Sequence, residues 1–94
     1  MLRYNGQSPW NVQVRATTKR AEANNVLGRL RARGYDAFLT ESMVRGQMWY
    51  RVRVGNLANQ KQAEALQRKL QASGYPDAFV ANGNELTAAN KQNR

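Results

Sequence analysis

The chain contains one segment twice, and this repeat limits most strongly how it can fold. Residues 12–35 align with residues 52–75 without a gap, and seven of the 24 aligned positions are identical. The identical pairs are Val12/Val52, Val14/Val54, Ala23/Ala63, Leu30/Leu70, Ala32/Ala72, Gly34/Gly74 and Tyr35/Tyr75. After one inserted residue, Pro76, residues 36–38 align with residues 77–79. Each copy has room for a strand, a helix and a second strand, so the duplication predicts a β-α-β-β-α-β domain.

Length and composition allow one domain and favour an acidic partner. A chain of 94 residues holds a modest core that buries roughly 60–65% of the unfolded-chain surface. The net charge of +9, from 15 basic and 6 acidic residues, favours nucleic acid, an acidic membrane or an acidic polysaccharide. The absence of Cys excludes disulfides and thiolate chemistry.

The folded domain is predicted to cover residues 10–82, built from the repeats 10–44 and 48–82. Residues 1–9 are polar and residues 83–94 have no apolar periodicity, so we expect a disordered leader and a disordered tail. No apolar run approaches the ~18–20 residues that span a bilayer, and the leader lacks a signal-peptide core. If the protein is exported, we expect the exporting segment to lie outside this chain.

Alternating and helical patterns predict the individual elements. Alternation of apolar and polar residues predicts strands at 10–14, 36–44, 48–54 and 77–82. Apolar stripes predict two helices, with Ala23, Val26, Leu27 and Leu30 on the first and Ala63, Leu66 and Leu70 on the second. We expect Thr17 or Thr18 to cap the first helix, Asn59 to cap the second, and Gly34 and Gly74 to end them.

Two such units with right-handed crossovers predict an α+β fold of the RNA-recognition or ferredoxin-like type. Its four-stranded antiparallel sheet carries both helices on one face, and the first and third strands form the central pair. The inward positions of that pair are Val12, Val14, Tyr50, Val52 and Val54. The other face is predicted to carry Gln13, Arg15, Trp49, Arg51 and Arg53, with Phe38 and Phe79 as candidates from the edge strands. An exposed aromatic and basic face suggests a binding site.

Several segments together resemble a known family. They are Val12-Gln13-Val14 with the Ala-rich helix after it, Gly34-Tyr35, the WYRVRVG run at 49–55, and residues 63–75. Over about residues 10–81 this pattern resembles the SPOR domain, the sporulation-related repeat of bacterial division and cell-wall proteins. The resemblance implies a βαββαβ module that binds septal peptidoglycan at glycan strands lacking stem peptides. It also implies a location in the periplasm or cell envelope, at the division septum.

The same resemblance implies that the open sheet face contacts the ligand. Carried over to this sequence, it implicates Gln13, Trp49 and Arg51, and also Arg53. With the neighbouring candidates, the predicted glycan-binding residues are Gln13, Arg15, Trp49, Arg51, Arg53 and Phe79. A glycan strand without peptides exposes lactyl carboxylates that suit Arg, sugar faces that suit Trp, and hydroxyl groups that suit a Gln amide.

The sequence departs from the family at the end of the first strand. The usual Gly-Ser-Phe is replaced by Arg15, Ala16 and Thr17, so a core anchor is lost and a charge is added beside the expected groove. Leu57 stands where an aromatic residue is common in the second half.

Some of these residues have simpler structural explanations. Arg29, Arg31 and Arg33 fit a solvated helix face. Gln13 can merely decorate the sheet, and Trp49 can pack under the turn at Gly46. Phe38 and Phe79 move into the core if the parity of the edge strands is wrong.

The competing function is binding of single-stranded RNA by the same topology. An RNA-recognition motif needs aromatic residues at two alternating outward positions of the third strand, and these positions hold Arg51 and Arg53. An enzyme is disfavoured because there is no His or Cys and the six carboxylates include no close pair for acid–base work. We therefore expect a non-catalytic, monomeric module without metal or cofactor, and we expect neither nucleic acid nor a membrane as its partner.

Overall fold

The structure is a computed structural model, and it describes residues 9–82. The terminal segments predicted to be disordered lie outside the described residues, except for Pro9. The elements in chain order are β1 (Trp10–Thr17), α1 (Arg20–Ala32), β2 (Ala37–Val44), β3 (Gln47–Val54), α2 (Gln60–Ala72) and β4 (Phe79–Asn82). The strands form one antiparallel sheet in the order β2-β3-β1-β4, so the predicted βαββαβ fold and its central pair are confirmed.

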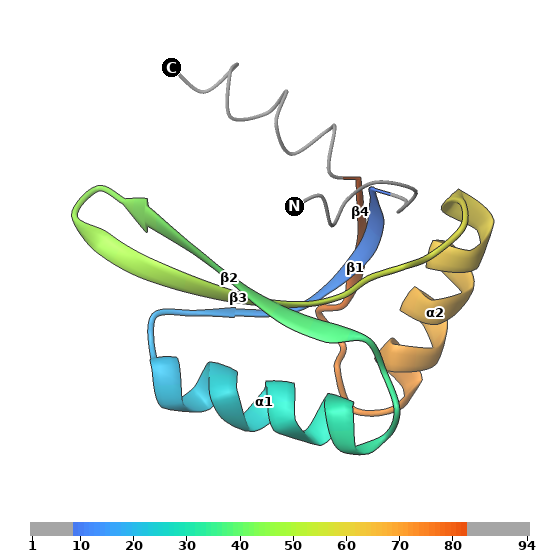
Figure 1. Ribbon diagram of the computed structural model, residues 1–94, viewed down its shortest axis with the longest axis horizontal. Coiled ribbons are helices and arrows are strands. Elements are labelled where there is room, and N and C mark those ends of the chain that lie inside the picture. The colour runs from blue at the N-terminus through green and yellow to red at the C-terminus, as the bar shows by residue number, and fades with distance from the viewer. Residues whose placement is uncertain (1–8, 83–94) are drawn as a thin grey trace.

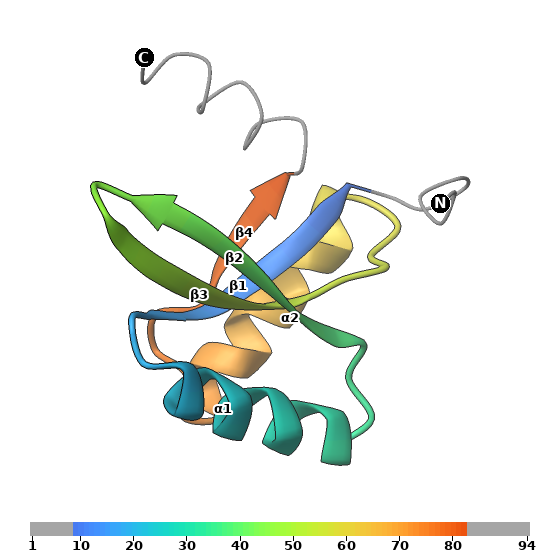
Figure 2. The ribbon, with the colours of Figure 1, turned by 60° about the vertical axis from the view of Figure 1, so that its left-hand side comes forward.

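Both helices pack on the same side of the sheet (Figures 1 and 2). The valines of the central pair are 0–2% exposed and contact the helices through Leu30 of α1 and Leu70 of α2. Tyr75 completes this layer at 7% exposure, while Tyr35 and Tyr50 are partly buried against it. The period-2 and helical patterns therefore identified the core correctly.

The helix ends follow the predicted signals with one exception. Gly34 and Gly74 have φ of 90° and 106°, which a residue with a side chain rarely adopts. Asn59 caps α2 by accepting a 2.9 Å hydrogen bond from the Gln62 backbone N–H. For α1, the cap residue is Lys19 and no side chain caps the helix there, so the prediction of a Thr cap is wrong.

A β-bulge in β1 changes which side chains face the helices. Gln13 pairs with Arg53, but Arg15 pairs with Val52, so Val14 is an extra residue on this strand. One extra residue reverses the inward and outward alternation beyond it. Arg15 therefore lies on the side of Val52, facing the helix layer, and its predicted place on the open face is wrong.

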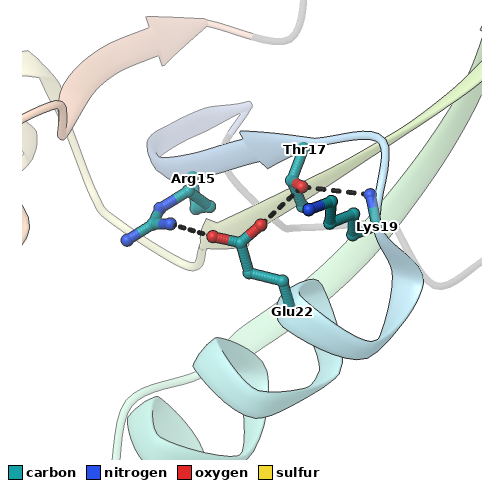
Figure 3. A network of polar contacts seen from close by, with 4 residues as sticks. All are labelled: Arg15, Thr17, Lys19 and Glu22. Carbon is teal, nitrogen blue, oxygen red and sulfur yellow. Dashed lines mark hydrogen bonds and ion pairs between the residues drawn. The ribbon is translucent and has the colours of Figure 1, made fainter.

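The reversed segment joins a polar network with the first turn of α1 (Figure 3). Glu22 accepts from Arg15 Nη1 at 2.5 Å through one carboxylate oxygen and from Thr17 Oγ1 at 2.7 Å through the other. Thr17 Oγ1 in turn accepts a 3.0 Å hydrogen bond from the Lys19 backbone N–H. Thr17 is only 8% exposed, so these bonds satisfy a buried hydroxyl. The network accounts for two of the departures from the family pattern, Arg15 and Thr17, because Glu22 engages both.

Candidate functional site

The sheet face that points away from both helices is called the open face. Its central feature is a row of four side chains, one from each strand. Phe38 of β2 pairs with Arg53 of β3, Arg53 pairs with Gln13 of β1, and Gln13 pairs with Phe79 of β4. Directly paired residues point to the same face, and neighbouring strands lie about 4.8 Å apart, so the row spans about 14 Å. The predicted residues Gln13, Arg53 and Phe79 therefore lie together.

Arg53 is an unusual member of this row because it is a cation that is only 6% exposed. Its Nε donates to Thr40 Oγ1 at 3.3 Å, and its Nη1 donates to Asn11 Oδ1 at 3.2 Å. Both acceptors are neutral. The ion pairs among residues 9–82 are Arg15–Glu22 and Arg20–Glu41, and neither involves Arg53. The guanidinium thus lies in a desolvated position without a carboxylate partner from the described part of the chain.

The electrostatics of Arg53 reflect this setting. Burial, and secondly the positive charge of Arg51, lower the pKa of the Arg53 guanidinium from its ordinary value. An arginine in water has a pKa so high that the group stays charged in spite of such a shift. A buried cation without a counter-charge is costly, and an anion placed beside it offsets this cost.

One nitrogen of Arg53 makes no hydrogen bond to another described residue. No side-chain nitrogen or oxygen of the described residues is both fully buried and without a hydrogen-bond partner. The hydrogen bonds of Arg53 to described residues use Nε and Nη1, so Nη2 is not completely enclosed by the protein. This nitrogen is therefore a candidate contact for an anionic ligand.

Arg51 and Trp49 form a second group on the same strand. The Arg51 guanidinium lies 6.0 Å from the centre of the Trp49 ring, within the range of a cation–π contact. Its Nη1 also donates to Ser42 Oγ at 2.6 Å. Since Trp49 pairs with Ser42 on the face of Arg51, it extends the open face toward the end of the hairpin.

The Phe79 ring is exposed, and the Gln13 amide has no hydrogen-bond partner among residues 9–82. Phe79 is 46% exposed, although large apolar side chains are usually covered. The half-buried Gln13 amide lies between Arg53 and Phe79, and it makes no hydrogen bond to residues 9–82. It therefore presents two donor hydrogens and an acceptor oxygen to the surface.

Gly55 makes room for the aromatic residue at the other end of the row. A Cβ atom placed on Gly55 would lie 2.9 Å from Cε1 of Phe38, which is shorter than carbon atoms tolerate. The Gly that ends the WYRVRVG run therefore lets the Phe38 ring lie over the β3 backbone. Phe38 belongs to the open face, as one of the two parities considered for it predicts.

Sequence reasoning missed the residues that hold Arg53. Asn11 has outward parity, but nothing in the sequence links it to a residue 42 positions away. Thr40 likewise lies across the hairpin. The helix arginines Arg29, Arg31 and Arg33 are exposed, as the solvated interpretation requires, and Arg31 Nε donates to the Ala37 carbonyl at 2.9 Å.

The described residues contain neither a cluster of metal ligands nor a membrane-spanning helix. Residues 9–82 contain no cluster of three His, Cys, Asp or Glu side chains that is suited to a metal ion. Neither described helix is long and apolar enough to cross a bilayer.

A small α+β domain whose open sheet face combines aromatic rings, an amide and a buried cation belongs to the class of βαββαβ binding modules. The family model of the SPOR domain matches residues 6–82, and the chain belongs to this family. SPOR domains are peptidoglycan-binding modules of cell-envelope and division proteins.

One solved structure has the same fold. The crystal structure of the RlpA SPOR domain from Pseudomonas aeruginosa is similar with a TM-score of 0.69 and 16% sequence identity. The match covers 78% of this chain and 97% of that one. A search of curated protein sequences finds no match.

Proposed function

We propose that the open face binds glycan strands of peptidoglycan that lack stem peptides. The module itself is non-catalytic, and it targets the division or cell-wall protein that carries it to the septum. One observation supports this most strongly. Arg53 is a buried cation without a carboxylate partner among residues 9–82, and it lies in one row with Gln13 and Phe79.

The charge of the site selects for a carboxylate in the ligand. Removal of the stem peptide leaves the lactyl group of the sugar as a free carboxylate, once per disaccharide. Arg53 Nη2 and the Arg51 guanidinium are neighbours on β3, and guanidinium groups bind carboxylates through paired, charge-assisted hydrogen bonds. Asn11 and Thr40 already hold Arg53 in place, so little further ordering is required when the ligand binds.

The uncharged part of the site suits the sugar rings. Phe79 at the β4 end of the row and Trp49 at the hairpin end offer flat apolar surfaces for the C–H faces of pyranose rings. The Gln13 amide is placed between them to exchange hydrogen bonds with hydroxyl or N-acetyl groups. A repeating acidic sugar presents this combination of groups, whereas an intact stem peptide would block the carboxylate.

A pull-down with purified sacculi tests the proposal. We expect strong binding to amidase-treated sacculi and weaker binding to untreated sacculi at about physiological ionic strength, where the Debye length is ~8 Å. Gln13→Ala is expected to weaken binding to treated sacculi. The matched control, Gln60→Ala, removes an exposed amide of α2 outside the open face and leaves binding unchanged.

Competition with RNA separates the glycan from a general polyanion. Binding that depends on phosphate neutralisation falls steeply with salt, while ring stacking and amide hydrogen bonds are screened little. Poly-U is therefore expected to displace little of the bound protein at that salt. Equal binding to both kinds of sacculi, or complete displacement by poly-U, would reject the denuded-glycan ligand and favour RNA.

A further inference from the structure

The end of the β2–β3 hairpin projects beyond the rest of the sheet. Pairing between β1 and β3 stops at Thr17 and Tyr50, so residues 47–49 pair only with β2. Residues 42–49 are called the hairpin tip. Both views show the tip extending away from α2 and from β4 (Figures 1 and 2).

Apolar side chains gather at this tip. Among the described residues, only three large apolar side chains are exposed to solvent. Two of them lie at the tip, Met43 with an exposed fraction of 61% and Val44 with one of 41%. Adjacent residues of a strand point to opposite faces, so these two lie on opposite sides of the hairpin. Met48 pairs with Met43 on one side, and Trp49 lies on the side of Val44. The tip is therefore apolar on both faces.

The charge of the tip is positive and its backbone is well defined. The turn residues Arg45 and Gly46 have φ of 52° and 82°, as in the two-residue type I′ turns that match strand twist. Residues 42–49 contain no Asp or Glu. The nearest acidic residue in the sequence is Glu41. Its Oε2 lies 3.9 Å from Arg20 Nη1, so the Glu41 charge is paired with that of Arg20.

We propose that the hairpin tip docks end-on into the interfacial region of an anionic lipid bilayer. A protein surface laid against the hairpin covers one face and leaves the apolar side chain of the other face in water. A bilayer surrounds an inserted tip and covers Met43 and Val44 together. Trp49 is suited to the headgroup level, and Arg45 to the acidic phosphates.

The dimensions of the tip agree with this placement. Trp49 follows the turn residue Gly46 by three positions, or about 10 Å of strand. Apolar faces of interfacial segments enter a bilayer by roughly 5–10 Å, so immersion of Met43 and Val44 leaves Trp49 near the headgroups. This proposal differs from the expectation from the sequence that a membrane is not a partner of this chain. Glycan binding is centred on the Gln13–Arg53 row, and of its proposed contact residues only Trp49 also belongs to the hairpin tip.

Vesicle flotation with the full chain tests the proposal. We expect binding to vesicles of equimolar phosphatidylglycerol and phosphatidylcholine, and much weaker binding to phosphatidylcholine alone. The double substitution Met43→Thr with Val44→Thr keeps strand propensity and charge but removes the apolar groups. We expect it to weaken partitioning by about tenfold or more, since each buried CH₂ group contributes ~0.8 kcal/mol, and to leave binding to treated sacculi unchanged.

Phe79→Ser is the matched control, because it removes the third exposed apolar side chain at a distance from the tip. We expect it to keep vesicle binding and to lose sacculus binding. In a Trp10→Phe background, the emission of Trp49 should shift to the blue when acidic vesicles are added. Met43→Gln alone, at a side chain already 61% exposed, provides a second variant that should fold normally and bind vesicles less.

Four results would overturn the proposal. Equal flotation of the wild type and the double variant would assign vesicle binding to the basic helices. Equal binding to neutral and acidic vesicles would remove the role of charge. No flotation, or an association of the chain with itself that the double substitution abolishes, would show that the tip meets protein or solvent rather than lipid.

Discussion

Each side of the sheet carries an arginine from a central strand, and the two arginines differ in whether a carboxylate balances their charge. On the helix side, Arg15 of β1 is paired with the Glu22 carboxylate, which also accepts from Thr17. On the open side, Arg53 of β3 is more deeply buried, yet its acceptors Asn11 and Thr40 are neutral. The first arginine has its counter-charge within the fold, and the second has its charge available for a ligand. Under the proposed function, the helix side serves stability and the open side serves binding.

Substitutions in the core, which lies between the sheet and the two helices, should give the largest effect on stability. Leu30→Ala is expected to lower the free energy of unfolding by about 2–4 kcal/mol, because Leu30 is fully buried. Leu70→Ala at the equivalent place in α2 should behave alike. Chemical denaturation measures the loss. Sacculus binding per folded molecule should not change, and a loss of binding by fully folded Leu30→Ala protein would contradict the separation of the two sides.

Glu22→Ala tests the helix side. The substitution leaves the Thr17 hydroxyl and the Arg15 guanidinium without their shared acceptor. A lost hydrogen bond to a buried group costs about 1–3 kcal/mol, and the partial exposure of the ion pair favours the lower part of this range. Thermal unfolding should show the loss, while binding to treated sacculi stays at the wild-type level.

The matched control for Glu22→Ala is Glu64→Ala, which removes a carboxylate of α2 that accepts a 3.1 Å hydrogen bond from the exposed Gln60 amide. Its effect on unfolding should be close to zero. Similar losses from both substitutions would show that the network around Glu22 has no special role.

Arg53→Met tests the open side and should have the reverse outcome. Replacing a buried charge by an apolar side chain of similar length is often neutral or stabilising, so the free energy of unfolding should change by less than about 1 kcal/mol. Affinity for treated sacculi should fall about tenfold or more, which corresponds to the ~1.4 kcal/mol of one charge-assisted hydrogen bond.

Arg29→Met removes the same charge from the exposed face of α1 and serves as the control. It should leave both stability and sacculus binding near wild type. If Arg53→Met and Arg29→Met lost sacculus binding equally, binding would depend on the net charge of the domain. The difference between Arg15 and Arg53 would then not explain where the ligand binds.

Gly55→Ala should give the smallest effect. The new methyl group meets the outer part of the Phe38 ring, which can turn aside, so the free energy of unfolding should fall by less than about 1 kcal/mol. Binding to treated sacculi should weaken slightly because Phe38 ends the row. Gly28→Ala, where the added methyl group meets no atom, should instead stabilise α1 by about 0.5–1 kcal/mol. A larger loss of binding in Gly28→Ala than in Gly55→Ala would argue against the row.

The repeat and the alternation of apolar residues were sufficient to predict the fold, because a duplicated βαβ unit has few ways to bury its stripes. The place of Arg15 could not be predicted in this way. Its side is set by a bulge at Val14, and no Gly or Pro at that position marks the extra residue. The burial of Arg53 could not be predicted from the sequence either. Alternation gives the face on which a side chain lies, but not the size and polarity of its neighbours. The residues that accept its hydrogen bonds, Asn11 and Thr40, come from two other strands.

The most direct test follows amide and Arg Nε–H resonances during a titration with soluble, peptide-free glycan oligomers. We expect the largest shifts at Gln13, Arg53 and Phe79, with a displaced Arg53 Nε–H signal as the carboxylate approaches. The Arg15 Nε–H signal should stay in place, since its guanidinium is paired with Glu22 on the other side of the sheet. Shifts concentrated on Arg15 and α1, with an unchanged Arg53, would contradict the assignment of the open face as the glycan site.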